Sequence, residues 1–204
     1  NADLAYCDYE RFKDKIYYDH LKTPNTEEIS FEDFYEAEDH TTKVISCAKL
    51  YKMTIFEKLR FRLGRFHEDE FLYNDLMNIL EGSIVHLKNK LYYYRQNESS
   101  IMNSPLSIKR LEDSADAFLQ RVNLLFSKKI GSNLTKKFCI DFLIGIILNK
   151  GWKCRFLKRS KIIRKTFLYS YRFGINKIPS VCFIIAPLFS LSIFKIFYFN
   201  KKSY

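Results

Sequence analysis

Glycine and proline are scarce in this sequence, which has six of the first and four of the second in 204 residues. That scarcity excludes a collagen-like or low-complexity chain. The composition is 47% hydrophobic and 17% aromatic, so the chain has enough apolar residues to bury a core and is not disordered throughout. The length allows one ordinary domain, or a domain with an appendage.

Acidic residues are absent after Asp141. Residues 1–141 hold 21 Lys and Arg against 23 Asp and Glu, whereas residues 142–204 hold 13 Lys and Arg and no acid. The formal net charge of +11 therefore belongs to the C-terminal part of the chain.

Motifs of catalysis are also missing from the sequence. It has neither a phosphate-binding glycine loop nor a G-x-S-x-G nucleophile elbow. The run His67-Glu68-Asp69-Glu70 lacks the second histidine of a zinc-protease helix. The four histidines are scattered without ligand spacing, which predicts solvated surface side chains. We therefore predict no enzymatic activity, no cofactor and no metal site.

The five cysteines, Cys7, Cys47, Cys139, Cys154 and Cys182, form no C-x-x-C pair. Such wide spacing suits long-range disulfides in an oxidising compartment, and it equally suits small buried apolar residues. Cys7, Cys47 and Cys139 are the candidate disulfide cysteines. Two sequons make Asn97 and Asn133 candidate glycosylation sites, which favours secretion.

Apolar residues recur at helical spacing in four segments, 4–21, 71–95, 105–127 and 134–150. Ser104 and Pro105 are typical of the start of the third helix. A further short helix is expected within residues 54–66. No region shows sustained alternation of apolar and polar residues between hairpin turns. The sequence predicts an all-α fold, a four-helix bundle with a long first crossover connection and a basic, hydrophobic C-terminal tail.

The tail gives the second of two predicted domains, 1–150 for the helical bundle and 151–204 for the tail. Residues 153–165 are basic, and residues 178–194 are uncharged. The uncharged stretch is barely long enough to cross a bilayer as a helix. A tail anchor, a buried terminal helix, a β-rich piece and a stretch not selected to fold all remain open. If the protein binds a membrane, residues 178–199 are the segment expected to contact it.

One segment resembles a known family. Thr26-Glu27-Glu28-Ile29-Ser30-Phe31-Glu32-Asp33-Phe34, followed by Thr41-Thr42 and then Cys47, is similar to the acidic loop of the interleukin-12 alpha subunit, a long-chain four-helix cytokine. The order of the later helices is similar too, so that the resemblance covers about residues 4–148. In this resemblance Cys47 matches the cysteine that follows the loop, and Cys139 matches the cysteine of the last helix.

The resemblance implies a secreted, cytokine-like signalling subunit that binds a receptor-like beta subunit and cell-surface receptors. Asn149, Lys150 and Trp152, at the end of the last predicted helix, are the candidate partner contacts. The alternative functions are a tail-anchored helical membrane protein and a basic nucleic-acid-associated structural protein. The second alternative rests on the basic residues 153–165, which suit phosphate groups.

Overall fold

The computed structural model describes residues 2–15, 23–98, 100, 105, 107–148 and 156–172. The chain divides into two compact units, Asn1–Pro105 and Leu106–Tyr204. The predicted domain boundary after residue 150 falls in a stretch, 149–155, outside the described residues. That boundary therefore stays a prediction.

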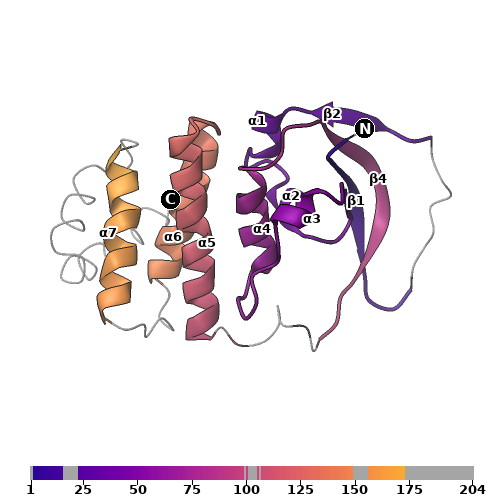
Figure 1. Cartoon of the computed structure of the whole chain (residues 1–204). Coiled ribbons are helices and arrows are strands. Elements are labelled where there is room, and N and C mark those ends of the chain that lie inside the picture. Colours follow the sequence, from indigo (N-terminus) through magenta and orange to yellow (C-terminus); the bar gives the residue numbers. More distant parts are fainter. Residues whose placement is uncertain are drawn as a thin grey trace, which may run out of the picture. The chain divides into compact units, whose positions relative to one another are not determined.

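A mixed four-stranded sheet forms the centre of the first unit (Figure 1). Its strands are β1 (Leu4–Phe12), β2 (Thr26–Ile29), β3 (Lys49–Tyr51) and β4 (Ile84–Arg95), in the order β2-β4-β1-β3. The central strands β1 and β4 are parallel, and each edge strand is antiparallel to its neighbour. The prediction of an all-α four-helix bundle is therefore wrong, because this unit has an α/β fold.

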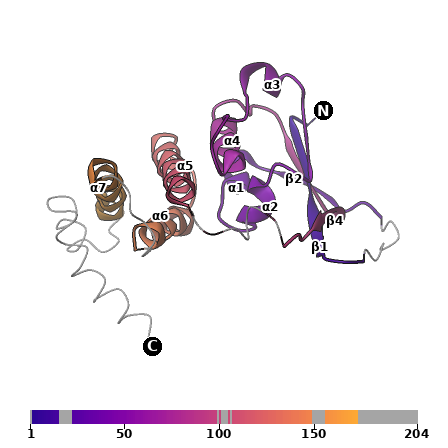
Figure 2. The ribbon, with the colours of Figure 1, turned by 90° about the horizontal axis from the view of Figure 1, so that it is seen from below.

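Four short helices accompany the sheet: α1 (Phe31–Phe34), α2 (His40–Val44), α3 (Ile55–Lys58) and α4 (Glu68–Leu76). Figure 2 shows α1, α2 and α4 on one side of the sheet. The Phe34 ring lies 5.7 Å from that of Tyr6 on β1 and 5.3 Å from that of Tyr73 on α4. The Tyr73 hydroxyl donates to the Phe34 carbonyl oxygen at 2.6 Å, so an aromatic cluster joins these elements.

The predicted helix over residues 4–21 is wrong where the structure describes it, because residues 4–12 form β1. Leu4 and Tyr6 are buried on the helix-covered face, while Ala5 and Cys7 between them are only half-buried. This alternation is the strand period, and it positions Tyr6 against α1.

The predicted helix over residues 71–95 is also wrong in its second half. Helix α4 ends at Leu76, and the chain returns as β4 from Ile84. Between them, the Gly82 amide donates to the Asp3 carboxylate at 2.8 Å, and a Cβ at this position would lie 2.6 Å from the same oxygen. A side chain at position 82 would displace the Asp3 carboxylate from this hydrogen bond, which lies in the turn between the helix and the strand.

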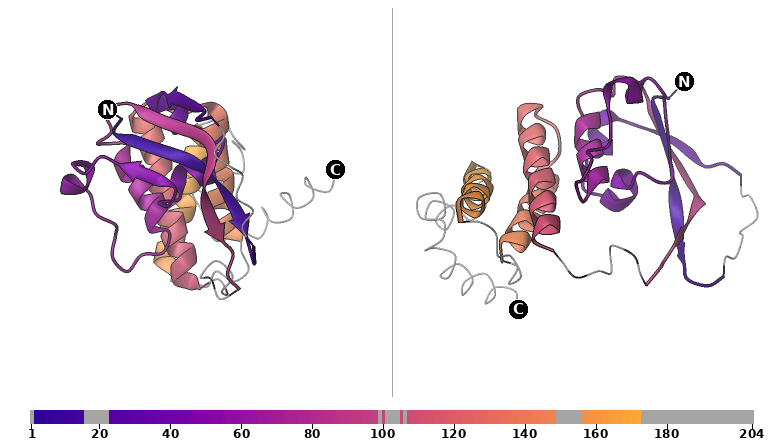
Figure 3. Two further views of the ribbon diagram at one scale, coloured as in Figure 1. Left: turned by 90° about the vertical axis from the view of Figure 1, so that its right-hand side faces the viewer. Right: turned by 60° about the horizontal axis from the view of Figure 1, so that its bottom comes forward.

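Three helices form the described part of the second unit: α5 (Ile108–Ser127), α6 (Asn133–Leu148) and α7 (Phe156–Arg172) (Figure 3). The rings of Phe118 on α5 and Phe142 on α6 are stacked 3.9 Å apart. The Tyr169 hydroxyl on α7 donates to Asn123 on α5 at 3.0 Å. The predicted helices at 105–127 and 134–150 are confirmed to within a few residues. Among the described residues, no helix has the length and apolar character needed to span a membrane.

Candidate functional site

Three acidic residues, Glu68, Asp69 and Glu70, form the first turn of α4. His67 precedes them in the left-handed conformation, with φ of 58°, which few residues with a side chain adopt. This turn directs the chain into the helix, whose N-terminal dipole favours negative charge. The apolar residues Phe71 and Leu72 follow at once and are buried, so the first turn is held against the core.

Asp69 is half-buried, unlike the exposed Glu68. Burial raises the pKa of the Asp69 carboxyl above its ordinary value, and the negative charge of Glu70 adds to the effect. One Asp69 oxygen accepts a hydrogen bond from the Glu70 amide at 2.9 Å, which opposes the rise. A carboxylate with a raised pKa is a stronger base than an ordinary surface aspartate, so Asp69 is suited to accept a proton.

Strand β3 places a half-buried cation within the electrostatic range of Asp69. Lys49 donates hydrogen bonds to the carbonyl oxygen of Thr42 at 2.7 Å and to that of Ile45. Its ammonium also lies 5.9 Å from the centre of the Tyr6 ring. Burial lowers the pKa of Lys49 to about 8, and the Asp69 charge partly opposes this shift.

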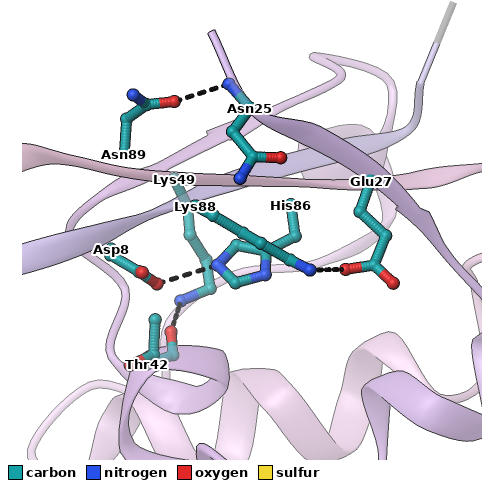
Figure 4. A network of polar contacts seen from close by, with 8 residues as sticks. All are labelled: Asp8, Asn25, Glu27, Thr42, Lys49, His86, Lys88 and Asn89. Atoms are coloured by element: carbon teal, nitrogen blue, oxygen red, sulfur yellow. Dashed lines mark hydrogen bonds and ion pairs between the residues drawn. The ribbon is translucent and has the colours of Figure 1, made fainter. Parts of the chain in front are cut away.

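Polar side chains continue from Lys49 across the helix-covered face of the sheet (Figure 4). His86 on β4 contacts the Asp8 carboxylate through its Nε2 atom at 2.8 Å, and its ring is stacked on Tyr6 at 4.3 Å. The His86 side chain is 11% exposed and that of Asp8 36% exposed. Lys88 and Glu27 form a neighbouring ion pair. These contacts fix the positions of the polar side chains around β1.

The residues singled out in the sequence are not brought together by the fold. Cys7 and Cys47 are half-buried free thiols in the first unit, and Cys139 is a buried free thiol in the second. Asn97 and Asn133 are exposed, so glycosylation at both stays a prediction. Three predicted partner contacts, Asn149, Lys150 and Trp152, lie outside the described residues, as do Cys154 and Cys182.

Sequence reasoning missed Asp69, Lys49 and the contact between Asp8 and His86. The available signal was the acidic triplet directly before an apolar run, which is typical of a helix start. The burial of Asp69 and Lys49 has no counterpart in residue spacing, because distant segments create it. His40 and His86 are largely buried, with side chains 17% and 11% exposed, so they are not the solvated residues we predicted.

Among the described residues, no group of three or more His, Cys, Asp or Glu side chains is arranged to hold a metal ion. The chemistry that the described site offers is a carboxyl group as proton acceptor, with a half-buried cation within its electrostatic range.

Comparison with known proteins gives one informative likeness. No family model matches the chain. Over 134 residues the chain is 31% identical to the glycosyltransferase GlyA of Streptococcus pneumoniae serotype 4 (strain ATCC BAA-334 / TIGR4). The match covers 61% of this chain and 19% of that protein, so the chain spans about a fifth of the length of the relative.

This likeness corrects the sequence-based function. The resemblance to the interleukin-12 alpha subunit is wrong, and so is the cytokine-like signalling subunit without enzymatic activity, because the relative is an enzyme of another class. The alternatives of a tail-anchored membrane protein and a nucleic-acid-associated protein have no support either. Secretion and the receptor-like beta subunit are untested predictions. The chain is similar to part of a glycosyltransferase.

Proposed function

We propose that this chain is part of a glycosyltransferase and that Asp69 is the general base that activates the acceptor hydroxyl. The observation that carries the proposal is the half-buried Asp69 carboxyl with its raised pKa, in a chain that is 31% identical to a glycosyltransferase over 134 residues. A buried carboxyl with a perturbed pKa is a physical reason to look for proton transfer at that point.

The reaction is the displacement of a leaving group from the anomeric carbon of an activated sugar. The acceptor hydroxyl oxygen forms a bond to that carbon while the bond from carbon to leaving group breaks, and the leaving group takes the electron pair. The hydroxyl proton passes to the Asp69 carboxylate, which must be ionised beforehand. Because burial raises its pKa, Asp69 binds this proton more strongly than an exposed aspartate would.

The remainder of the first unit holds Asp69 in place. Helix α4 is anchored by Tyr73, whose hydroxyl donates to the Phe34 carbonyl oxygen at 2.6 Å, and by the buried Phe71 and Leu76. The carboxylate therefore sits on a rigid element, which a base needs in order to meet the acceptor hydroxyl at hydrogen-bond distance.

The test compares Asp69→Asn with the wild-type chain. Each protein is incubated with a panel of nucleotide-activated sugars, and both transfer to sugar acceptors and transfer to water are measured by mass spectrometry. Loss of the base should lower kcat about 10²–10⁴-fold and leave the KM for the donor nearly unchanged. In the wild type, kcat/KM should rise with pH through an acid limb above 3.8, the ordinary aspartate pKa.

The matched control is Asp14→Asn, which makes the same chemical change at an exposed position. It should keep wild-type rates. Circular dichroism of both variants checks that the fold is retained. The proposal is wrong if the wild type transfers no sugar from any donor, or if Asp69→Asn and Asp14→Asn have equal rates.

A further inference from the structure

The segment that runs from β3 to α4 exposes large apolar side chains. Among the described residues, four such side chains are more than three-quarters exposed, and three of them lie here: Leu50 at 78%, Met53 at 79% and Leu63 at 97%. The fourth is Leu134 in the second unit. We call residues 50–63 the α3 loop. Figure 2 shows α3 extending away from the sheet and from α4.

The α3 loop is folded in spite of this exposure. Ile55 is buried, and the Phe56 ring contacts Tyr51 at 5.3 Å and Phe61 at 6.2 Å. At the end of the loop the Arg62 guanidinium donates to both oxygens of Asp75, at 2.8 and 2.9 Å. Met53 and Leu63 are therefore exposed on an ordered segment, and exposed apolar side chains that gather on one segment are typical of interaction sites.

The same segment has more basic than acidic residues. Residues 50–63 hold four Lys and Arg and a single acid, Glu57. Lys52 and Arg62 are paired with Asp3 and Asp75. Lys58 and Arg60 form no ion pair in the part of the chain that the structure describes, and both are exposed. The loop thus presents unneutralised positive charge beside exposed aliphatic side chains.

We propose that the α3 loop docks this protein on the anionic surface of a lipid bilayer. Met53 and Leu63 enter the boundary between headgroups and acyl chains, while Lys58 and Arg60 contact the lipid phosphates. Apolar insertion and attraction to anionic lipid are the two contributions by which peripheral proteins bind membranes, and each is weak alone. Charge complementarity favours the anionic bilayer as the occupant. An acidic protein surface is the competing partner, and the experiment below distinguishes the two.

The experiment is vesicle flotation of the full chain at low ionic strength. Vesicles of phosphatidylcholine alone are compared with vesicles that contain 30% phosphatidylglycerol, as a probe on the order of physiological anionic content. Two double variants remove one contribution each, Met53→Ser with Leu63→Ser, and Lys58→Glu with Arg60→Glu. Each should weaken binding to anionic vesicles by at least about tenfold. Added salt should weaken the binding of the wild type.

Matched controls lie in the second unit. Leu134→Ser alters an equally exposed leucine, and Lys128→Glu with Lys129→Glu reverses two exposed charges. These controls should bind like the wild type, which shows that the losses in the loop variants are not a general effect of removing an exposed leucine or reversing two exposed charges. The changed residues are exposed, so unchanged thermal melting confirms the fold of every variant.

Three results would overturn the docking surface: no preference of the wild type for anionic vesicles, equal losses in loop and control variants, or no loss in the loop variants. Loop variants that float normally but lose binding to an immobilised polyglutamate would identify a protein-binding surface instead. No sugar donor is present in flotation, so its outcome is independent of the glycosyltransferase proposal.

Discussion

Lys49 is a cation whose environment in the fold differs strongly from that in the unfolded chain. Its ammonium is half-buried, and burial lowers its pKa from 10.5 to about 8. Between these two values the unfolded chain keeps a proton that the folded protein has lost, so the unfolded state binds more protons. Stability from this residue therefore rises with pH from about 8 to 10.5, and below pH 8 the buried charge costs stability.

We predict that Lys49→Met removes this pH dependence. The unfolding free energy of the wild type, measured relative to the variant by urea denaturation, should rise by roughly 2 kcal/mol between pH 8 and pH 10. Lys52→Met, at an exposed position on the same segment, is the control and should follow the wild type. Parallel curves for the wild type and Lys49→Met would show that Lys49 titrates alike in both states.

The sequence shows which groups can ionise. Burial in the fold determines which of these groups have a shifted pKa. The acidic triplet Glu68–Glu70 is typical of a solvent-exposed helix start, and Glu68 is exposed in the structure. Asp69 is the next residue of α4 and therefore points to a different side of the helix, where its side chain is half-buried. No pattern within the triplet distinguishes the two, because burial depends on how the rest of the unit packs against α4.

Among the elements, α5 and α6 were predictable and the two central strands were not. Helix α5 buries one continuous stripe, including Leu111, Phe118 and Leu125, at helical spacing. In β4 the strand period is interrupted: Cys7 pairs with Leu87, but the next residue, Asp8, pairs with Lys90. This irregularity interrupts the alternation of buried and exposed residues that identifies a strand. The leucines and tyrosines of β4 then lie at spacings that are also typical of a helix.

The start of α5 provides a test at the same scale. The sequence predicts Ser104 as the cap and Pro105 as the first helical residue, but the structure begins the helix at Ile108 with Ser107 as its N-cap. The Ser107 hydroxyl oxygen accepts a hydrogen bond from the Arg110 amide at 3.1 Å.

Ser107→Ala should therefore destabilise the protein by about 1 kcal/mol in thermal unfolding, because the Arg110 amide loses its partner. Ser107→Asp keeps a cap acceptor and should cost much less than alanine. Equal losses for the alanine and aspartate variants would mean that the side chain at position 107 does not cap α5.

At the scale of the molecule, each compact unit has its own core. The first is built on Phe34, Tyr73 and Ile84, and the second on Phe118, Leu125 and Ile140. A large aromatic side chain removed from one core should therefore lower the protection of that unit against hydrogen exchange and leave the other unit nearly unchanged.

Phe34→Ala should cost about 3–5 kcal/mol, because it leaves a cavity between α1, α4 and β1. Native-state hydrogen exchange followed by mass spectrometry should then show faster exchange in β1 and β4 and unchanged exchange in α5 and α6. Leu125→Ala should give the reverse pattern. Equal acceleration in both units would mean that they unfold as one.

The parallel pair β1 and β4 also determines when the first unit can fold. Leu4 pairs with Ile84, and these positions are about 80 residues apart in the chain. Contacts between such distant residues require a large loop to close before any of them forms, which slows folding. During synthesis the centre of the sheet cannot form until β4 leaves the ribosome. Until then β1 has no partner along the edge that later pairs with β4, while most of the unit is being synthesised.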